Sequence, residues 1–222
     1  MLQPLKLLSR AAQTDLERIL MKETLAATEV STSTISRPQR RELIPSGLLA
    51  VSIAIVTELM LFTGFISAFM IVKGRAVGGV WPPAGQPLLP VEETAVNTAA
   101  LILSGILLIV TEVVFRKNTS LAKIPMALSI GLGGWFVAAQ GAEWTALLEQ
   151  GLTLTSSAHG AFFYTIVGFH GIHAVVALGF MLGAFVRLLM DNLTAGQLWA
   201  TQAFWYFVVG IWPLIYWQVY IG

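Results

Sequence analysis

Glu58 is the residue of this sequence whose setting most needs a chemical explanation. It lies in the segment Val-Thr-Glu-Leu-Met-Leu-Phe-Thr-Gly-Phe, with long apolar stretches on both sides. A charged carboxylate deep in a bilayer costs a few kcal/mol, so Glu58 is expected to face the interior of a helix bundle, to stay protonated, or both. Three roles are open: a neutral acid hydrogen-bonded to a neighbouring helix, a proton-linked function, or contact with a lipid headgroup.

The histidines decide whether a metal or haem site is conceivable. His170 and His173 stand three positions apart in Gly-Phe-His-Gly-Ile-His, which on a helix separates them by about 60° around the axis and about 4.5 Å along it. His159 lies eleven positions before His170, about 16 Å away along such a helix and too far to share an ion. A metal site would need Glu58 or another helix to supply a third ligand. Buried, hydrogen-bonded packing histidines beside glycines are the expected alternative.

Two further acids lie toward the ends of apolar stretches. Glu143 stands in Gln-Gly-Ala-Glu-Trp, with Gln140 one turn earlier on the same helix face. Its position predicts a solvated or salt-bridged acid at the membrane surface. Glu112 lies four positions before Arg116, the spacing of an ordinary ion pair at a helix end, and no function is predicted for it.

The composition is that of an integral membrane protein. Of the 222 residues, 56% are hydrophobic and only 11% are charged, whereas soluble domains carry about 25% charged residues. The lack of cysteine excludes disulfides, iron–sulfur clusters and thiolate copper centres. A net charge of +1 with scattered basic residues argues against binding nucleic acid.

The inventory of side chains also argues against a catalytic centre on this chain. A haem–copper centre needs about six histidine ligands, and the sequence contains three histidines. There is no serine–histidine–acid arrangement, phosphate-binding glycine loop or zinc-protease helix motif.

Five apolar stretches predict the fold. They cover roughly residues 46–72, 94–115, 124–148, 159–189 and 198–221, and each meets the requirement of about 20 residues for crossing a bilayer. The runs are continuous rather than alternating, and they exceed the roughly 11 residues of a membrane strand. The expected fold class is therefore an all-α integral membrane protein, with a five-transmembrane-helix bundle formed by residues 45–222.

The basic residues predict the orientation of the bundle. If the N-terminus is cytoplasmic, eleven of the thirteen Lys and Arg residues lie on the inner side, and only Lys73 and Arg75 lie outside. The loop at residues 73–93 and the C-terminus are then external.

Residues 1–44 are expected to form a cytoplasmic N-terminal arm. Apolar residues recur there at helical spacing and favour a short amphipathic helix on a membrane surface; they are Leu5, Leu8, Ala12, Leu16 and Ile19. A Ser/Thr-rich linker from Thr28 to Arg37 follows. A disordered arm is the alternative.

The loop between the first two spans is rich in proline, which restricts its backbone. Four prolines fall within residues 81–90, where they fix φ and remove hydrogen-bond donors, so the segment is neither a helix nor a central strand. The loop motif consists of Trp81, Pro82, Pro83, Gly85 and Pro90, together with Asn97 in the following apolar run.

Four segments together resemble subunit III of cytochrome c oxidase and related haem–copper terminal oxidases. In chain order they are Glu58–Phe65, the loop motif with Asn97–Thr98 and Ser104–Gly105, Gln140–Trp144, and Gly168–His173 with the aromatic last span. The resemblance covers residues 46–222. Five spans match the shorter bacterial form of this subunit.

The resemblance implies roles for particular residues. Glu58 corresponds to the mid-membrane, carbodiimide-reactive glutamate of the family, and Glu143 to the acid of the third-span motif. His170 and His173 correspond to the paired histidines of the next helix. Together they are the expected proton-linked or lipid-cleft residues.

The resemblance also implies a function. The family's bundle is split by a lipid-filled cleft and packs on catalytic subunit I, with subunit II and other respiratory subunits as further partners. The expected protein is a non-redox accessory subunit in the bacterial inner membrane. It binds phospholipid and no cofactor of its own, while haem and copper lie in partner subunits. It sustains proton uptake as the complex, a cytochrome c or quinol oxidase, reduces oxygen to water.

The last span departs from the family pattern. Where the family usually has a histidine followed three residues later by an aspartate, this sequence has Tyr206 and Val209, and Pro213 lies further along the span. The departure leaves a divergent oxidase or an accessory subunit of a nitric oxide reductase as alternatives.

Two alternatives of other classes come from the residues themselves. One is a stand-alone proton or small-solute carrier that uses Glu58, Glu143 and His170 as a relay. The other is a membrane enzyme with a histidine-bound metal.

Overall fold

The computed structural model describes residues 17–26, 46–76, 81–83 and 85–222. The chain divides into two units, Met1–Leu43 and Ile44–Gly222. In the first unit, residues 17–26 form a helix whose residues are all exposed. Most of the predicted amphipathic pattern (Leu5, Leu8, Ala12 and Leu16) and the Ser/Thr-rich linker lie outside the described residues.

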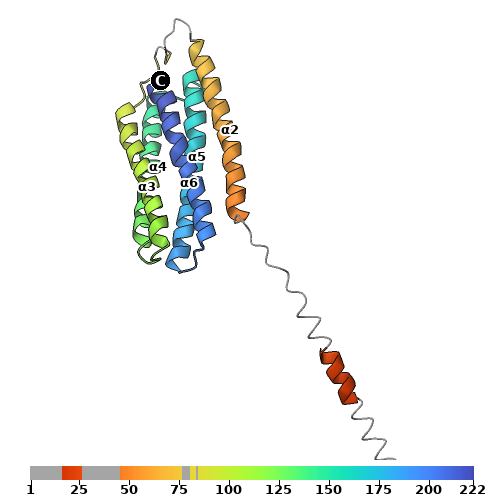
Figure 1. Cartoon of the computed structure of the whole chain (residues 1–222). Coiled ribbons are helices and arrows are strands. Elements are labelled where there is room, and N and C mark those ends of the chain that lie inside the picture. Colours follow the sequence, from red (N-terminus) through yellow and green to blue (C-terminus); the bar gives the residue numbers. More distant parts are fainter. Residues whose placement is uncertain (1–16, 27–45, 77–80, 84) are drawn as a thin grey trace, which may run out of the picture. The chain divides into compact units, whose positions relative to one another are not determined.

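Five long helices make up the second unit (Figure 1). They are α2 (Ser46–Gly74), α3 (Val91–Phe115), α4 (Lys123–Glu149), α5 (Ala158–Leu189) and α6 (Ala195–Tyr216). A π-helical segment, Trp217–Ile221, continues α6 to the end of the chain. All five are long and apolar enough to cross a membrane, and the described residues contain no strand. The predicted all-α fold with five membrane spans is confirmed.

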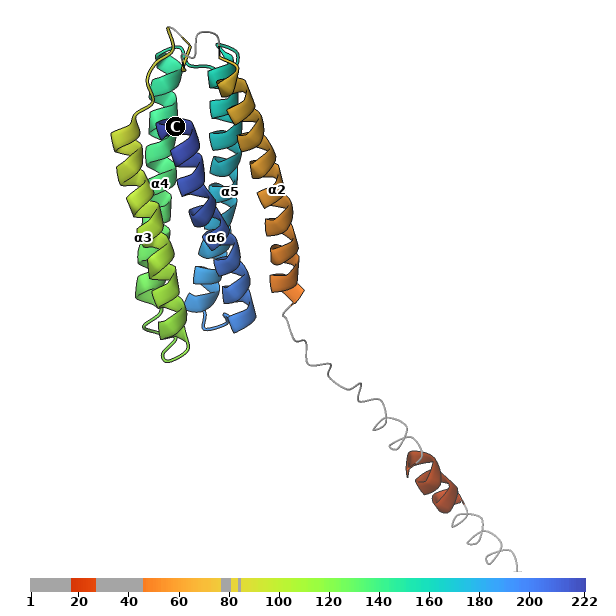
Figure 2. The same cartoon turned by 45° about the horizontal axis from the view of Figure 1, so that its top comes forward.

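The helices differ in how far they are enclosed. Helix α2 packs against α6 and α5, α3 against α4 and α6, and α4 against α5. Both views place α2 beside α5 and α6, with α3 and α4 on the other side of the bundle (Figures 1 and 2). Within its most apolar stretch, 50% of the α6 span is buried, against 6% of α2. Helix α6 is therefore the centre of the bundle and α2 its edge.

Hydrogen bonds donated by side chains link α3 to its neighbours. Ser104 Oγ donates to the carbonyl oxygen of Ser129 on α4 (2.9 Å), and Ser129 Oγ donates back to the carbonyl oxygen of Ser104 (2.8 Å). From α6, Trp205 Nε1 donates to Ser104 Oγ (3.1 Å) and Trp212 Nε1 to Thr98 Oγ1 (2.8 Å). Hydrocarbon offers these groups no partner, so their pairing fixes which helix faces meet.

Short polar residues mark where two of the helices begin. The Ser157 side chain accepts a hydrogen bond from the Gly160 N–H at the start of α5. Thr194 and Gln197 form a capping box at the start of α6. These contacts satisfy backbone donors that have no partner within the helix, and they set the helix starts.

Gly133 on α4 leaves room for the fully buried indole of Trp205 on α6. A Cβ atom at this position would lie 2.7 Å from Cη2 and 2.8 Å from Cζ2 of that ring. We therefore expect Gly133→Ala to lower the free energy of unfolding by about 1–3 kcal/mol, because the ring would have to move within a packed core. Thermal or denaturant unfolding of the purified chain in detergent measures the change.

Gly131→Ala is the matched control on the same helix. A Cβ at Gly131 meets nothing within 4 Å, so this variant should keep or slightly raise the stability, as alanine favours helix over glycine. Equal stability of the two variants would contradict the packing of Trp205 on Gly133.

Candidate functional site

Glu58 on α2 and His173 on α5 lie side by side. His173 Nε2 is 3.1 Å from Glu58 Oε2, and the exposed fractions of the two side chains are 14% and 29%, respectively. The second ring nitrogen, Nδ1, lies 2.7 Å from the carbonyl oxygen of Phe169. Oε2 has no partner in full hydrogen-bond geometry, so the contact with Nε2 is a close approach rather than an aligned hydrogen bond.

The Phe169 carbonyl determines which ring nitrogen of His173 carries a proton. A carbonyl oxygen only accepts, so Nδ1 of His173 carries a proton. This leaves Nε2 of His173 facing Oε2 of Glu58. A carboxyl group and an imidazole are both side chains that transfer protons.

Phenylalanine rings surround His173 on the bundle side. The ring centroid of Phe62 lies 5.6 Å from that of His173, and those of Phe207 and Phe204 lie at 6.1 and 6.3 Å. Glu58 keeps the more exposed side chain of the pair. The pair thus has an apolar inner wall and one side open to whatever surrounds α2 at that level.

His170 occupies a different environment from His173. Its residue is 1% exposed, and its ring stacks on Trp212 at 4.7 Å and meets the edge of Phe136 at 6.1 Å. Neither ring nitrogen has a hydrogen-bond partner among the described residues. His170 is therefore buried, as a packing histidine would be, but the hydrogen bonds expected for it are missing.

Glu143 on α4 is the acceptor at the centre of a polar cluster. Asn97 Nδ2 on α3 donates to Oε1 (2.7 Å), and Thr94 Oγ1 lies 2.9 Å from Oε2. Gln140 Nε2 donates to Oε2 (2.7 Å) and to the hydroxyl oxygen of Tyr220 (3.0 Å). The structure therefore differs from the surface acid expected from the sequence: the carboxylate is partly buried and is met by neutral donors instead of a cation.

The four predicted site residues thus fall into three environments: Glu58 with His173, His170 among aromatic rings, and Glu143 in its own cluster. Sequence reasoning missed Thr94 and Tyr220, which complete the Glu143 cluster. A buried threonine one turn before Asn97 is a weak signal, and nothing in the sequence places the chain end beside Gln140.

The first half of the loop motif packs against both α2 and α5. The Trp81 ring meets Phe69 of α2 at 5.6 Å and His159 of α5 at 5.3 Å, both edge to face. The peptide bond between Trp81 and Pro82 is cis. His159 is buried, and its ring nitrogens have no hydrogen-bond partner among the described residues.

The second half of the loop motif leads into α3. The Pro83 carbonyl accepts from the Gln86 N–H (3.2 Å), and Gly85 between them has a φ of 85°, a conformation that glycine adopts without strain. Pro90 directly precedes α3, and Asn97, two turns into that helix, binds Glu143.

The two residues of the last span that depart from the family pattern, Tyr206 and Val209, lie in partly buried positions. A Cβ on Gly105 would lie 3.2 Å from Cγ1 of Val209, so Val209 packs directly onto this glycine. The Tyr206 hydroxyl is buried and has no hydrogen-bond partner among the described residues.

Within the described ranges, no three or more His, Cys, Asp or Glu side chains lie close enough together to hold a metal ion. Glu58 and His173 offer two such groups.

The profile of the family named Cytochrome c oxidase subunit III matches residues 17–222. This chain belongs to the cytochrome c oxidase subunit III family. Cytochrome c oxidase subunit 3 of Hippopotamus amphibius is 29% identical over 174 residues, which cover 75% of this chain and 66% of that protein. The proteins of Syncerus caffer and Aepyceros melampus are 30% and 29% identical with the same coverage. The match spans just under two thirds of the length of these relatives.

Membership in the subunit III family confirms the resemblance drawn from the four sequence segments. Together with the five apolar helices, it identifies the chain as a multi-pass membrane protein.

We expect Glu143→Gln to loosen the junction of α3 and α4. The new amide would direct an N–H group at side chains that already donate, leaving Asn97 or Gln140 without an acceptor. The predicted loss in the free energy of unfolding is about 1–3 kcal/mol. Glu92→Gln, at an exposed position in the first turn of α3, is the control and should change stability by less than about 0.5 kcal/mol. Thermal unfolding in detergent compares the stability of the two variants. Equal losses of stability would contradict the role of Glu143 as the central hydrogen-bond acceptor of the cluster.

Proposed function

We propose that this subunit III homologue is a non-redox accessory subunit of a haem–copper terminal oxidase complex in aerobic respiration. Family membership supports the assignment to an oxidase complex. In this proposal, haem and copper lie in partner subunits. Subunit I is the main contact, and subunit II and other respiratory subunits are further neighbours.

The Glu58–His173 pair is the observation that carries the functional proposal. Glu58 lies twelve residues after the first residue of the 29-residue helix α2, or about 18 Å along a helix of about 43 Å. An acid near the middle of a span, held beside an imidazole at 3.1 Å, supports a role in proton exchange. We infer that the pair sustains proton uptake into the catalytic partner during reduction of oxygen to water.

The surface of α2 supports a role for lipid and a partner chain. Of its 29 residues only Phe62 and Phe69 are buried, so most of this helix is available for contacts outside the chain. We propose that phospholipid occupies a cleft of the assembled subunit, including a site next to this surface. The basic residues support a cytoplasmic N-terminus and an external C-terminus in a bacterial inner membrane.

Glu58→Gln tests this function in the intact complex. The amide keeps the size of the side chain and removes its exchangeable acid proton, so the complex should assemble with a normal haem spectrum. We expect proton uptake, or the number of turnovers before inactivation, to fall by roughly tenfold, which corresponds to a barrier raised by about 1.4 kcal/mol. Stopped-flow proton uptake and prolonged oxygen consumption measure the two quantities.

Glu112→Gln is the matched control. Glu112 pairs with Arg116 four residues later on the same helix, and this variant should behave as the unmodified complex. If Glu58→Gln also takes up protons and sustains turnover normally, Glu58 has no proton-linked role.

A further inference from the structure

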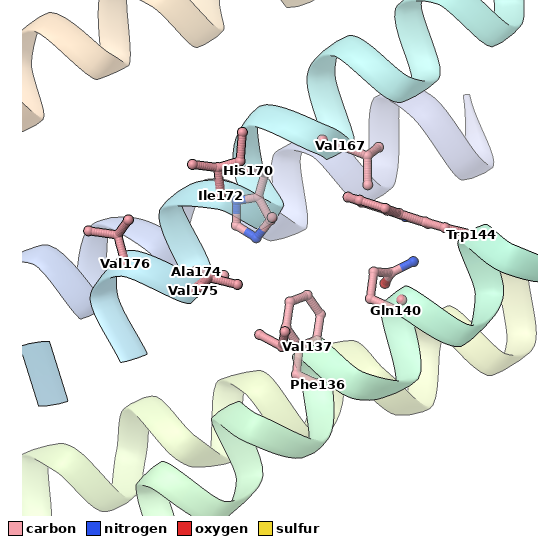
Figure 3. A pocket seen from close by; sticks show the side chains of 13 residues that line it. Phe136, Val137, Gln140, Trp144, Val167, His170, Ile172, Ala174, Val175 and Val176 are labelled. Atoms are coloured by element: carbon pink, nitrogen blue, oxygen red, sulfur yellow. The ribbon is translucent and has the colours of Figure 1, made fainter. Parts of the chain in front are cut away.

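A cavity of about 340 Å³ lies between α4 and α5 (Figure 3). Its lining does not include the Glu58–His173 pair and is mostly apolar, with Phe136 and Val137 on α4 facing Val167 on α5. Ile172 and Val175 also line it and are 61% and 54% exposed on the surface of the bundle. The cavity therefore opens on the outer surface of the bundle.

Two buried polar side chains face this cavity from opposite helices. His170 is 1% exposed and Gln140 is 4% exposed. Figure 3 shows the imidazole of His170 directed into the space between the helices, across from Gln140 on α4. Both ring nitrogens of His170 and Oε1 of Gln140 have no hydrogen-bond partner among the described residues. The amide nitrogen of Gln140, in contrast, is fully used by Glu143 and Tyr220.

Trp144 closes one end of the cavity. A Cβ on Gly171 would lie 2.9 Å from Cη2 of this indole, so the ring lies directly over the glycine. Its Nε1 also has no partner among the described residues. Unpaired polar groups are costly in a membrane interior because no water is present to satisfy them. Three side chains at one site therefore call for a polar group from outside the chain.

The donors and acceptors at this site define the group that fits. Gln140 Oε1 can only accept, Trp144 Nε1 can only donate, and a neutral imidazole has one N–H and one bare nitrogen. A hydroxyl group both donates and accepts, so a single such group can pair with Gln140 Oε1 and with an N–H donor at the same time. An ester or ketone oxygen only accepts and would leave Gln140 Oε1 unpaired. The lining contains no Asp, Glu, Lys or Arg, which disfavours a charged headgroup.

We propose that this cavity binds an apolar molecule that ends in a hydroxyl group and enters from the bilayer. The volume is within the range of small-molecule sites. Its apolar body lies along Val137, Ile172 and Val175, and its hydroxyl group is held between His170 and Gln140. The site is separate from the proposed proton pair and does not depend on that function.

Photolabelling of the purified native complex tests the site. The probe is dodecanol with a photoreactive diazirine on its chain, compared with the methyl ether of the same molecule, which cannot donate a hydrogen bond. Mass spectrometry should locate the alcohol on the α4 and α5 segments that line the cavity, with labelling about tenfold above that of the ether. His170→Phe keeps a ring of similar shape and should abolish the preference for the alcohol.

A second pair of variants tests the location. A Cβ on Gly168 meets nothing within 4 Å, and Gly168 lines the cavity, so Gly168→Leu should fill it and remove the labelling. Gly131→Leu is the control, because Gly131 also has open space but lies outside the lining. Equal labelling by alcohol and ether, labelling that survives Gly168→Leu, or no labelling because a partner subunit covers the cavity would each overturn the proposal.

Discussion

The hydrocarbon core of a membrane supplies no hydrogen-bond partner, so each polar group in these five helices must find one in the protein or in another molecule. Helices α3, α4 and α6 pair several of their polar groups with one another, through the reciprocal bonds of Ser104 and Ser129, the Trp205 indole and the cluster around Glu143. These bonds hold α3, α4 and α6 together as one side of the bundle. Helix α2 is attached mainly through apolar side chains, among them the buried Phe62 and Phe69, and through the contact of Glu58 with His173.

This division bears on the proposed role of the subunit. A pair of proton-exchanging side chains buried among α3, α4 and α6 would have no route by which a proton could leave the bundle. The Glu58–His173 pair lies at the edge helix instead, where the Glu58 side chain is 29% exposed. The Phe169 carbonyl keeps His173 oriented, and phenylalanine rings pack against it on the bundle side. In the proposed function, a proton at this position is accessible to a neighbouring subunit from the exposed side of Glu58.

Part of this architecture could be predicted from the sequence. Continuous apolar runs gave the five spans, and an acid deep in such a run pointed to Glu58, because both signals are local. The pairing of Glu58 with His173 could not be predicted, since it depends on how α2 packs against α5. Glu143 looked like a surface acid because two of its neutral partners, Thr94 and Asn97, come from α3. The cavity beside His170 is a space between α4 and α5, lined in part by polar atoms without hydrogen-bond partners among the described residues. No sequence pattern predicts such a space, because it depends on how the two helices pack.

The most direct test of the account is to purify this chain from its native membrane in mild detergent and to record the visible spectrum and the protein composition of what accompanies it. The account predicts a stoichiometric complex with a haem-bearing, copper-containing oxidase partner, and no metal bound to this chain once it is separated. A colourless chain that conducts protons alone, a nitric oxide reductase as the partner, or iron or copper retained by the isolated chain would contradict it.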